Sequence, residues 1–158
     1  MKHNKGFTLV EVLIIMGIIA ILFSITSLSL SNTVPKNSLD NAVQLFIADL
    51  KQQQLYALTG ETNGQSSSSN YGIYFSSGKY TLFQGVSYSA NNTSNYEVKL
   101  DDINTSTSAS GGVIIFQKNS GQIQNFIPSN NTITFTQVNI NQSVTLTFNK
   151  YGVIESIL

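Results

Sequence analysis

An apolar run near the N-terminus constrains this chain more than any other feature. Residues 7–30 contain one charged side chain, Glu11, and follow a short basic segment, residues 1–6. As an α-helix, these 24 residues would extend for about 36 Å, which is enough to cross a hydrocarbon core of about 30 Å. The lysines of the basic segment would keep that end cytoplasmic. We therefore expect a transmembrane helix over residues 7–31.

Three interpretations of this segment compete. It could be an ordinary cleaved signal peptide, with a basic start, an apolar stretch and small residues near a cleavage site, or an uncleaved single-span anchor. Neither explains Glu11, because a carboxylate inside a membrane segment costs about 2.5–3.5 kcal/mol and usually has a function. Neither explains why the basic segment ends in Gly6 directly before Phe7.

The third interpretation is a resemblance to a known family. Residues 5–14, KGFTLVEVLI, resemble the signal of type IV prepilins and pseudopilins. In that family a prepilin peptidase cuts after the glycine and usually N-methylates the new first residue. The resemblance implies cleavage between Gly6 and Phe7, N-methylation of Phe7, and an assembly role for Glu11. The carboxylate could then pair with the N-terminal amine of a neighbouring subunit, because opposite charges attract strongly in a low-dielectric setting.

A second helical pattern follows the apolar run. Residues 32–37 form a polar joint in which Pro35 is expected to kink or interrupt a helix. Ser38 is a candidate N-cap and Gly60 a candidate stop for a helix over residues 38–59. Its apolar residues fall on one stripe at helical spacing, and these are Leu39, Ala42, Val43, Phe46, Ile47, Leu50 and Ala57. The polar side chains Asn41, Gln44, Lys51 and Gln52 lie on the opposite face.

Beyond the polar loop at residues 60–70, the period of the sequence changes from helical to twofold. This alternation predicts β-strands over residues 71–76, 79–84, 96–100, 113–118, 122–127, 132–138, 143–149 and 152–157. The Ser/Asn/Thr-rich stretches 86–95 and 101–112 are expected to be loops. The predicted fold class is α+β, with a long N-terminal helix packed on an antiparallel β-sheet domain. The expected parts are a leader (1–6), an assembly helix (7–31) and a globular domain (32–158).

The rest of the chain resembles the GspH/FimT group of minor pilins and pseudopilins. The resemblance rests on residues 39–60, residues 71–83 and a late turn at Gly152. Members of that group pair the long helix with a domain of two β-sheets. The resemblance implies a minor structural subunit of a type IV pilus or of a type II secretion or competence pseudopilus. The alternative is a binding module at the filament tip that contacts a surface, an exported protein or DNA.

The resemblance also implies partners and a location. The partners are prepilin peptidase, other pilins or pseudopilins in a filament, an inner-membrane assembly platform, and membrane lipid before assembly. The expected location is the cytoplasmic (inner) membrane, in a single pass with the C-terminal domain outside, and then the pilus or pseudopilus.

Composition argues against catalysis. The chain has no cysteine, and its one histidine, His3, lies in the expected leader, so a mature Ser–His–Asp triad is excluded. We expect no enzyme activity, no cofactor and no metal. Asp101 and Asp102 are expected to serve solubility or to form a turn. A calcium site there is the alternative, and it would need further oxygen ligands.

DNA binding is not expected of this subunit alone. The chain has no arginine, and removal of the leader leaves six lysines against eight acids, a formal charge of −2. Contacts with several phosphates need several cations. A modest site at Lys79 or Lys118 with nearby tyrosines is the alternative. The aromatic residues of the first predicted hairpin are expected to divide between core and surface, and these are Tyr71, Tyr74, Phe75, Tyr80 and Phe83.

Overall fold

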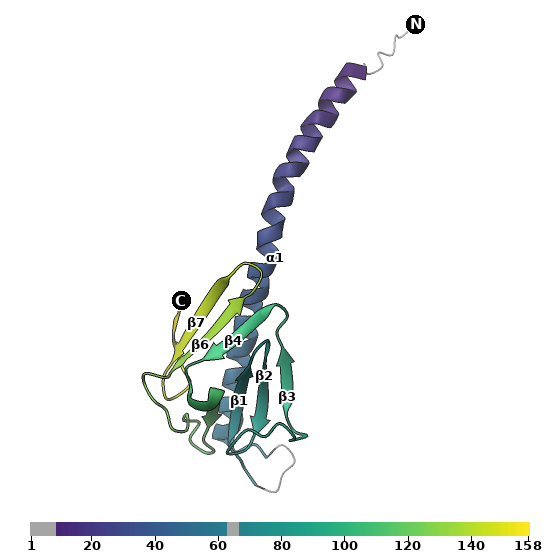
Figure 1. The fold of residues 1–158 in the computed structure, drawn as a ribbon. Helices are drawn as coiled ribbons and strands as arrows, with labels where there is room; N and C mark the ends of the chain where they lie inside the picture. Colours follow the sequence, from purple (N-terminus) through teal and green to yellow (C-terminus); the bar gives the residue numbers. More distant parts are fainter. Residues whose placement is uncertain (1–8, 63–66) are drawn as a thin grey trace. The chain divides into compact units, whose positions relative to one another are not determined.

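The fold has one long helix and two antiparallel sheets. The computed structural model describes residues 9–62 and 67–158, and for residues 23–37 it describes the backbone alone. The chain divides into two compact units, Met1–Pro35 and Lys36–Leu158. All strands belong to the second unit (Figure 1). The predicted α+β class, a helix followed by an antiparallel β-sheet domain, is confirmed.

Helix α1 runs from Leu9 to Thr59 without a break in its assignment. The predicted N-cap at Ser38 is therefore wrong, because Ser38 lies inside α1. An interior proline loses one hydrogen bond and crowds the carbonyl four residues before it. Even so, α1 continues through the polar residues 32–37. A kink at Pro35 stays a prediction.

The helix ends where the sequence predicted. Gly60 has φ +70°, a left-handed conformation that glycine adopts without a side-chain clash. The amide of Glu61 then donates to the carbonyl of Tyr56 at 3.0 Å, as in a Schellman cap. The amide of Asn119 donates to the carbonyl of Ala57 at 2.8 Å. These bonds satisfy carbonyls that the end of a helix leaves without partners.

The second half of α1 packs one face on the domain core. Six of the seven residues of the predicted stripe are buried, and Ile47 packs partly buried against them. The four residues predicted for the opposite face are exposed. The helical period therefore identified the buried face correctly.

The first sheet has the strand order β3-β2-β1-β5. Strands β1 (Tyr71–Ser76) and β2 (Lys79–Gln84) form the predicted hairpin around Ser77 and Gly78. Strand β3 (Tyr96–Lys99) pairs with β2, and β5 (Val113–Phe116) pairs with β1. All three pairings are antiparallel, and Figure 1 labels the neighbouring strands β1, β2 and β3.

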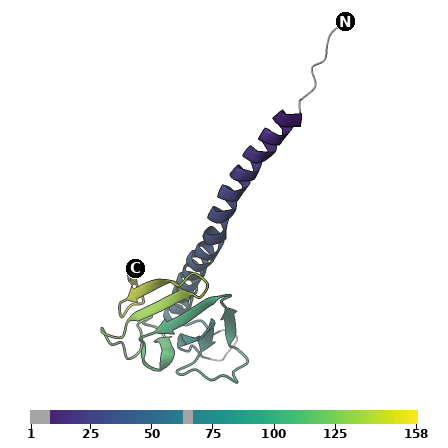
Figure 2. The ribbon, with the colours of Figure 1, turned by 45° about the horizontal axis from the view of Figure 1, so that its top comes forward.

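The second sheet has the strand order β4-β6-β7-β8. Its strands are β4 (Ile103–Thr107), β6 (Thr132–Gln137), β7 (Gln142–Phe148) and β8 (Ile154–Ile157). The predicted inward face of β6 and β7 is confirmed, since Val144 is half-buried and the other members are fully buried, namely Ile133, Phe135, Leu146 and Phe148. Strands β6 and β7 pair side by side at the green-to-yellow end of the colour scale in Figure 2.

Two strand assignments differ from the prediction. Residues 103–107 were expected to lie in a loop but form β4, in which Ile103 and Thr105 are buried. Residues 122–127 were expected to form a strand but make only one isolated bridge, at Ile123. Asn125 there has φ +53°, which interrupts an extended chain. Ile123 and its neighbour also send their amides to different partners, the carbonyls of Lys150 and Ile115.

Phe46 joins the helix to both sheets. It has no exposed surface, and its ring centroid lies 5.6 Å from that of Phe75, 5.4 Å from that of Tyr80 and 5.2 Å from that of Phe135. The first two partners belong to the first sheet and the third to the second sheet. Burial of a phenylalanine side chain stabilises a fold by about 1.5–3 kcal/mol, so this contact holds three elements together.

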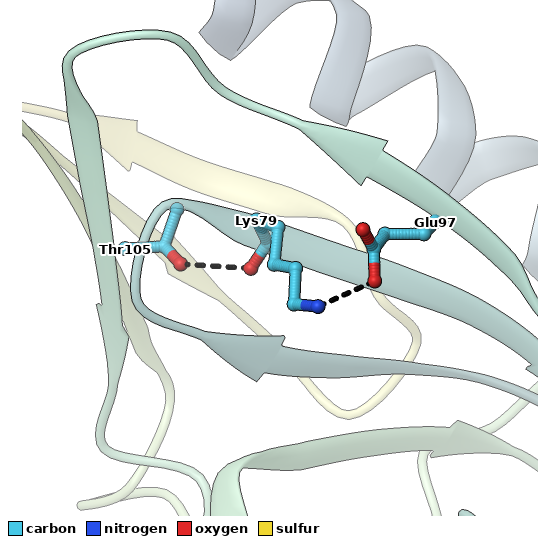
Figure 3. A network of polar contacts seen from close by, with 3 residues as sticks. All are labelled: Lys79, Glu97 and Thr105. Atoms are coloured by element: carbon cyan, nitrogen blue, oxygen red, sulfur yellow. Dashed lines mark hydrogen bonds and ion pairs between the residues drawn. The ribbon is translucent and has the colours of Figure 1, made fainter. Parts of the chain in front are cut away.

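Hydrogen bonds from β4 connect the two sheets at the end of the first hairpin. The hydroxyl of Thr105 donates to the carbonyl of Ser76 at 2.8 Å and lies 3.4 Å from the carbonyl oxygen of Lys79 (Figure 3). The Ser77 hydroxyl donates to Asn104 Oδ1 at 3.0 Å. Because Thr105 is buried, these partners remove the cost of burying its hydroxyl.

Gly72 allows an aromatic ring to cover the opposite strand. Gly72 pairs with Phe83 across β1 and β2, and a Cβ at position 72 would lie 2.6 Å from the Phe83 ring and 2.7 Å from the carbonyl oxygen of Ile114. On the same face Tyr88 stacks on Tyr74, with ring centroids 4.0 Å apart. The side-chain space above Gly72 is thus filled by Phe83.

Candidate functional site: the N-terminal helical segment

The first described turns of α1 carry exposed apolar side chains. Between Leu9 and Leu22, eleven large apolar residues are exposed, from 44% at Ile15 to 81% at Leu9. A helix that is apolar on all sides is suited to the interior of an assembly or of a membrane. The same helix buries Phe46 completely in the domain core. One continuous element thus presents two different surfaces.

This exposure has a large energetic consequence. Burial of each Val, Leu, Ile or Met side chain stabilises by about 1.5–3 kcal/mol relative to exposure, so the eleven side chains together represent on the order of 20 kcal/mol. Contiguous apolar surface of this kind marks a protein or membrane interaction site. The segment therefore presents an apolar surface of the kind that binds a protein or a membrane.

Glu11 is the one acid within this segment. It lies in the first turn of α1 with an exposed side chain. A negative charge near a helix N-terminus is favourable by about 0.3–1 kcal/mol, which offsets only part of the 2.5–3.5 kcal/mol or so that a carboxylate costs in a membrane.

Of the three predicted site residues, the structure describes Glu11. Gly6 and Phe7 lie outside the described residues, and so do the side chains of residues 23–37 in the second half of the predicted membrane segment. Among the described residues, no helix is both long and apolar enough to cross a membrane.

The comparison with protein families supports the processing signal. Residues 1–27 match the model of the prokaryotic N-terminal methylation motif, and this range contains Gly6, Phe7 and Glu11. The match indicates a type IV pilin-like signal. Such a signal supports a type IV pilin-like protein that prepilin peptidase processes and that assembles with other pilins. No curated protein and no solved structure gave a match.

The lysines considered for a nucleic-acid site differ in their surroundings. Lys79 Nζ lies 2.5 Å from Glu97 Oε2 (Figure 3). The hydrogen bond between them raises the pKa of Lys79 and lowers the pKa of Glu97. Lys118 is exposed, and its backbone amide donates to Asn70 Oδ1 at 3.0 Å. A phosphate at Lys79 would have to displace an existing carboxylate partner.

Asp102 and the aromatic residues of the first hairpin were the other candidates named from the sequence, and they contribute to the fold. Asp102 has φ +58° in a turn, its carbonyl accepts from the amide of Val138 at 2.9 Å, and its carboxylate accepts from Asn139 Nδ2 at 3.0 Å. Within residues 9–62 and 67–158 no three His, Cys, Asp or Glu side chains gather in a metal-binding group. The predicted division of the hairpin's aromatic residues between core and surface is wrong, because Tyr74 is half-buried and the other four are buried.

One polar connection was not predicted from the sequence. The hydroxyl of Tyr80, which has no exposed surface, donates to Asp49 Oδ2 at 2.6 Å. Burial, and then this bond, raise the pKa of Tyr80 well above its ordinary value of 10.0. Helical spacing gave no signal for it, since Asp49 lies at the border of the buried face and its partner is 31 residues away.

Proposed function

We propose that this protein is a minor structural subunit of a type IV pilus or of a type II secretion or competence pseudopilus. The observation that carries the proposal is the exposed apolar segment with one carboxylate, in a chain whose residues 1–27 match the N-terminal methylation motif. We further propose that the subunit belongs to the GspH/FimT group. The two antiparallel sheets beside the helix support this assignment, because that group pairs such a helix with two sheets.

The proposed mechanism begins with processing. Prepilin peptidase cuts between Gly6 and Phe7, which removes the two lysines of the leader and exposes an amine on Phe7. Before assembly the protein lies in the cytoplasmic membrane in a single pass, with lipid around residues 7–31 and the β domain outside. The inner-membrane assembly platform then transfers the helix into the filament. The precursor cannot assemble early because its Phe7 nitrogen is still part of a peptide bond.

Glu11 sets the register of the assembled helix in this proposal. Its carboxylate pairs with the Phe7 amine of a neighbouring subunit, and the attraction is strong because the filament interior has a low dielectric constant. The apolar residues from Leu9 to Leu22 supply most of the association energy. The carboxylate supplies specificity, because only one axial offset brings the two charges together.

The displayed domain is proposed to be non-catalytic and not to bind DNA by itself. The mature chain has no arginine and no histidine, and Lys79 already has a carboxylate partner. A mobility-shift assay of the purified protein at low and moderate salt tests this point. Salt-sensitive binding with micromolar affinity would favour the tip-module alternative.

The central test is the substitution Glu11→Ala in the host. We expect normal amounts of processed protein in the membrane fraction and at least about tenfold less protein in sheared filaments, which corresponds to a loss of about 1.4 kcal/mol. Asp40→Ala is the matched control, because Asp40 is an exposed acid on the same helix outside the segment. Normal incorporation of Glu11→Ala would refute the assembly role.

A second experiment is deletion of the gene, scored for piliation, protein secretion and DNA uptake. The process that is lost identifies whether the subunit serves a type IV pilus, a type II secretion pseudopilus or a competence pseudopilus.

A further inference from the structure

Strand β8 forms an open edge of the second sheet. The strand order is β4-β6-β7-β8, and among the described strands β8 pairs with β7 alone. The outer side of an edge strand presents backbone N–H and C=O groups that can pair with another chain. The register of β8 against β7 decides which residues present these groups.

The register directs the backbone of Ile157 outward. Thr145 and Leu158 exchange both backbone hydrogen bonds, at 2.7 and 3.0 Å, so they form a hydrogen-bonded pair. In an antiparallel ladder the next pair makes no such bonds, and here the next pair is Leu146 and Ile157. The N–H and C=O of Ile157 consequently point away from β7. Ile157 is 52% exposed, so the edge is accessible at this residue.

A groove of about 510 Å³ lies beside this edge, between β8 and the second half of α1. Residues paired across strands share one face of a sheet, so the side chain of Ile157 lies on the same face as the buried Leu146. Ile157 lines the groove together with Ile47 and Ile154, which are partly buried against the core. A strand added to β8 would therefore place every second side chain over apolar groups.

Lys51 adds a charge requirement to the groove. Lys51 and Glu155 are its two charged lining residues. The carboxylate of Glu155 accepts from Asn149 Nδ2 at 3.2 Å, whereas within residues 9–62 and 67–158 no carboxylate forms an ion pair with Lys51. An acidic side chain on the α1 side of an added strand would complement the lysine, and a basic one would be repelled.

We propose that β8 and this groove bind an extended segment of another polypeptide, which adds a strand to the second sheet. The segment has apolar residues at alternate positions and one acidic residue among them, directed at Lys51. In this mode of recognition the backbone hydrogen bonds supply affinity and the alternate side chains supply specificity. The inference rests on the edge and the groove and is independent of the proposed filament role.

A second copy of this chain fits the groove less well. Two β8 strands would pair at a spacing of about 4.8 Å, while packed helices keep their axes about 8–10 Å apart. Each copy has α1 at the border of its own groove, so the second helix would need the space that the groove offers. An extended segment with no helix packed beside it avoids this conflict.

The test measures binding of a fluorescein-labelled peptide, VTETVTV, to the full chain in detergent by fluorescence anisotropy, with empty micelles as the blank. The peptide alternates in pattern and carries its glutamate on the valine face. We expect a Kd on the order of 100 μM. Two N-methylated forms each block one of the two alternate sets of backbone amides, and one of these forms should bind at least about tenfold more weakly. The peptide VTKTVTV should bind about threefold more weakly.

Variants of the chain assign the binding to the groove. Lys51→Glu should weaken binding of VTETVTV about threefold and strengthen binding of VTKTVTV. Lys118→Glu is the matched control on an exposed lysine elsewhere and should change neither. Ile157→Pro removes an N–H that β7 does not use and should weaken binding at least about tenfold. Circular dichroism checks that this variant is folded, and Lys51→Glu decides the case if it is not.

Several results would overturn the proposal. These are no binding of VTETVTV, equal binding of the peptide and both N-methylated forms, or equal effects of Lys51→Glu and Lys118→Glu. The chain has no cysteine, so Glu155→Cys places a single thiol at the edge. Disulfide-linked dimers of this variant, without peptide binding by the parent chain, would assign the groove to a second copy and would also overturn the proposal.

Discussion

Replacement of Phe46 by alanine tests how helix and sheets are held together. Loss of the buried ring removes about 1.5–3 kcal/mol of burial energy. It also removes three aromatic contacts, with Phe75, Tyr80 and Phe135, each worth about 0.5–1.5 kcal/mol. These sums overlap the range of about 3–5 kcal/mol measured for Phe→Ala in protein cores. We expect a loss of about 4 kcal/mol, a large part of the 5–15 kcal/mol or so that stabilises a typical domain.

The assay is urea unfolding of the full chain in a mild detergent, followed by the near-ultraviolet circular dichroism of its tyrosines. With an m-value of about 2 kcal/mol/M, the midpoint should fall by about 2 M. Leu55→Ala is the control on the same helix, because Leu55 is exposed and alanine is a strong helix former. It should change stability by less than about 0.5 kcal/mol.

A small effect of Phe46→Ala would refute the packing argument. If the variant loses less than about 1 kcal/mol, the ring cannot be the contact that joins the two sheets. A loss of similar size in Leu55→Ala would show that the outer helix face is covered and would contradict the burial described above. Phe46→Leu should fall between the two, since it keeps apolar volume but loses the ring contacts.

Two further predictions concern the sheets. Gly72→Ala should destabilise the domain by about 1–3 kcal/mol in the same urea assay, because its Cβ would meet the Phe83 ring and the Ile114 carbonyl; no loss would contradict this close approach. The Lys79–Glu97 pair should stabilise the fold at intermediate pH. The pKa of Glu97 is lowered in the folded protein. Its contribution to stability is therefore present above pH 4.5, its ordinary pKa, and is lost as the pH falls through its folded-state pKa. The pKa of Lys79 is raised in the folded protein. Its contribution to stability is therefore present below pH 10.5, its ordinary pKa, and is lost as the pH rises through its folded-state pKa. The small stability difference between the protein and Glu97→Gln should therefore vanish at both extremes and in high salt; a difference that is constant with pH would contradict the pair's role.

Local patterns identified much of this fold because they report burial directly. The spacing of Leu39, Phe46 and Leu50 follows the helical turn, and all three are buried. Alternation in residues 132–138 and 143–149 marked strands that have one face in the core. The Gly6–Phe7 junction and Glu11 are a local signal too, and the match over residues 1–27 supports the interpretation of that segment.

The tertiary structure decided which polar segments are covered. Residues 103–107 are mostly Ser, Thr and Asn, yet they form a strand because β6 lies beside them and Thr105 finds carbonyl partners 26 and 29 residues away. Residues 122–127 alternate like a strand, but Asn125 is left-handed and the neighbouring amides bond to separate elements.

The apolar segment at the N-terminus was evident from the sequence, because a lone carboxylate in such a run stands out from its neighbours. The hydrogen bond between Tyr80 and Asp49 was not, since its two residues come from different elements and lie 31 residues apart. Periodicity describes one element at a time, whereas such a contact depends on how separate elements pack. The sequence by itself therefore determined the helix, the hairpin and the processing signal, and the packing of distant segments decided which polar residues are covered.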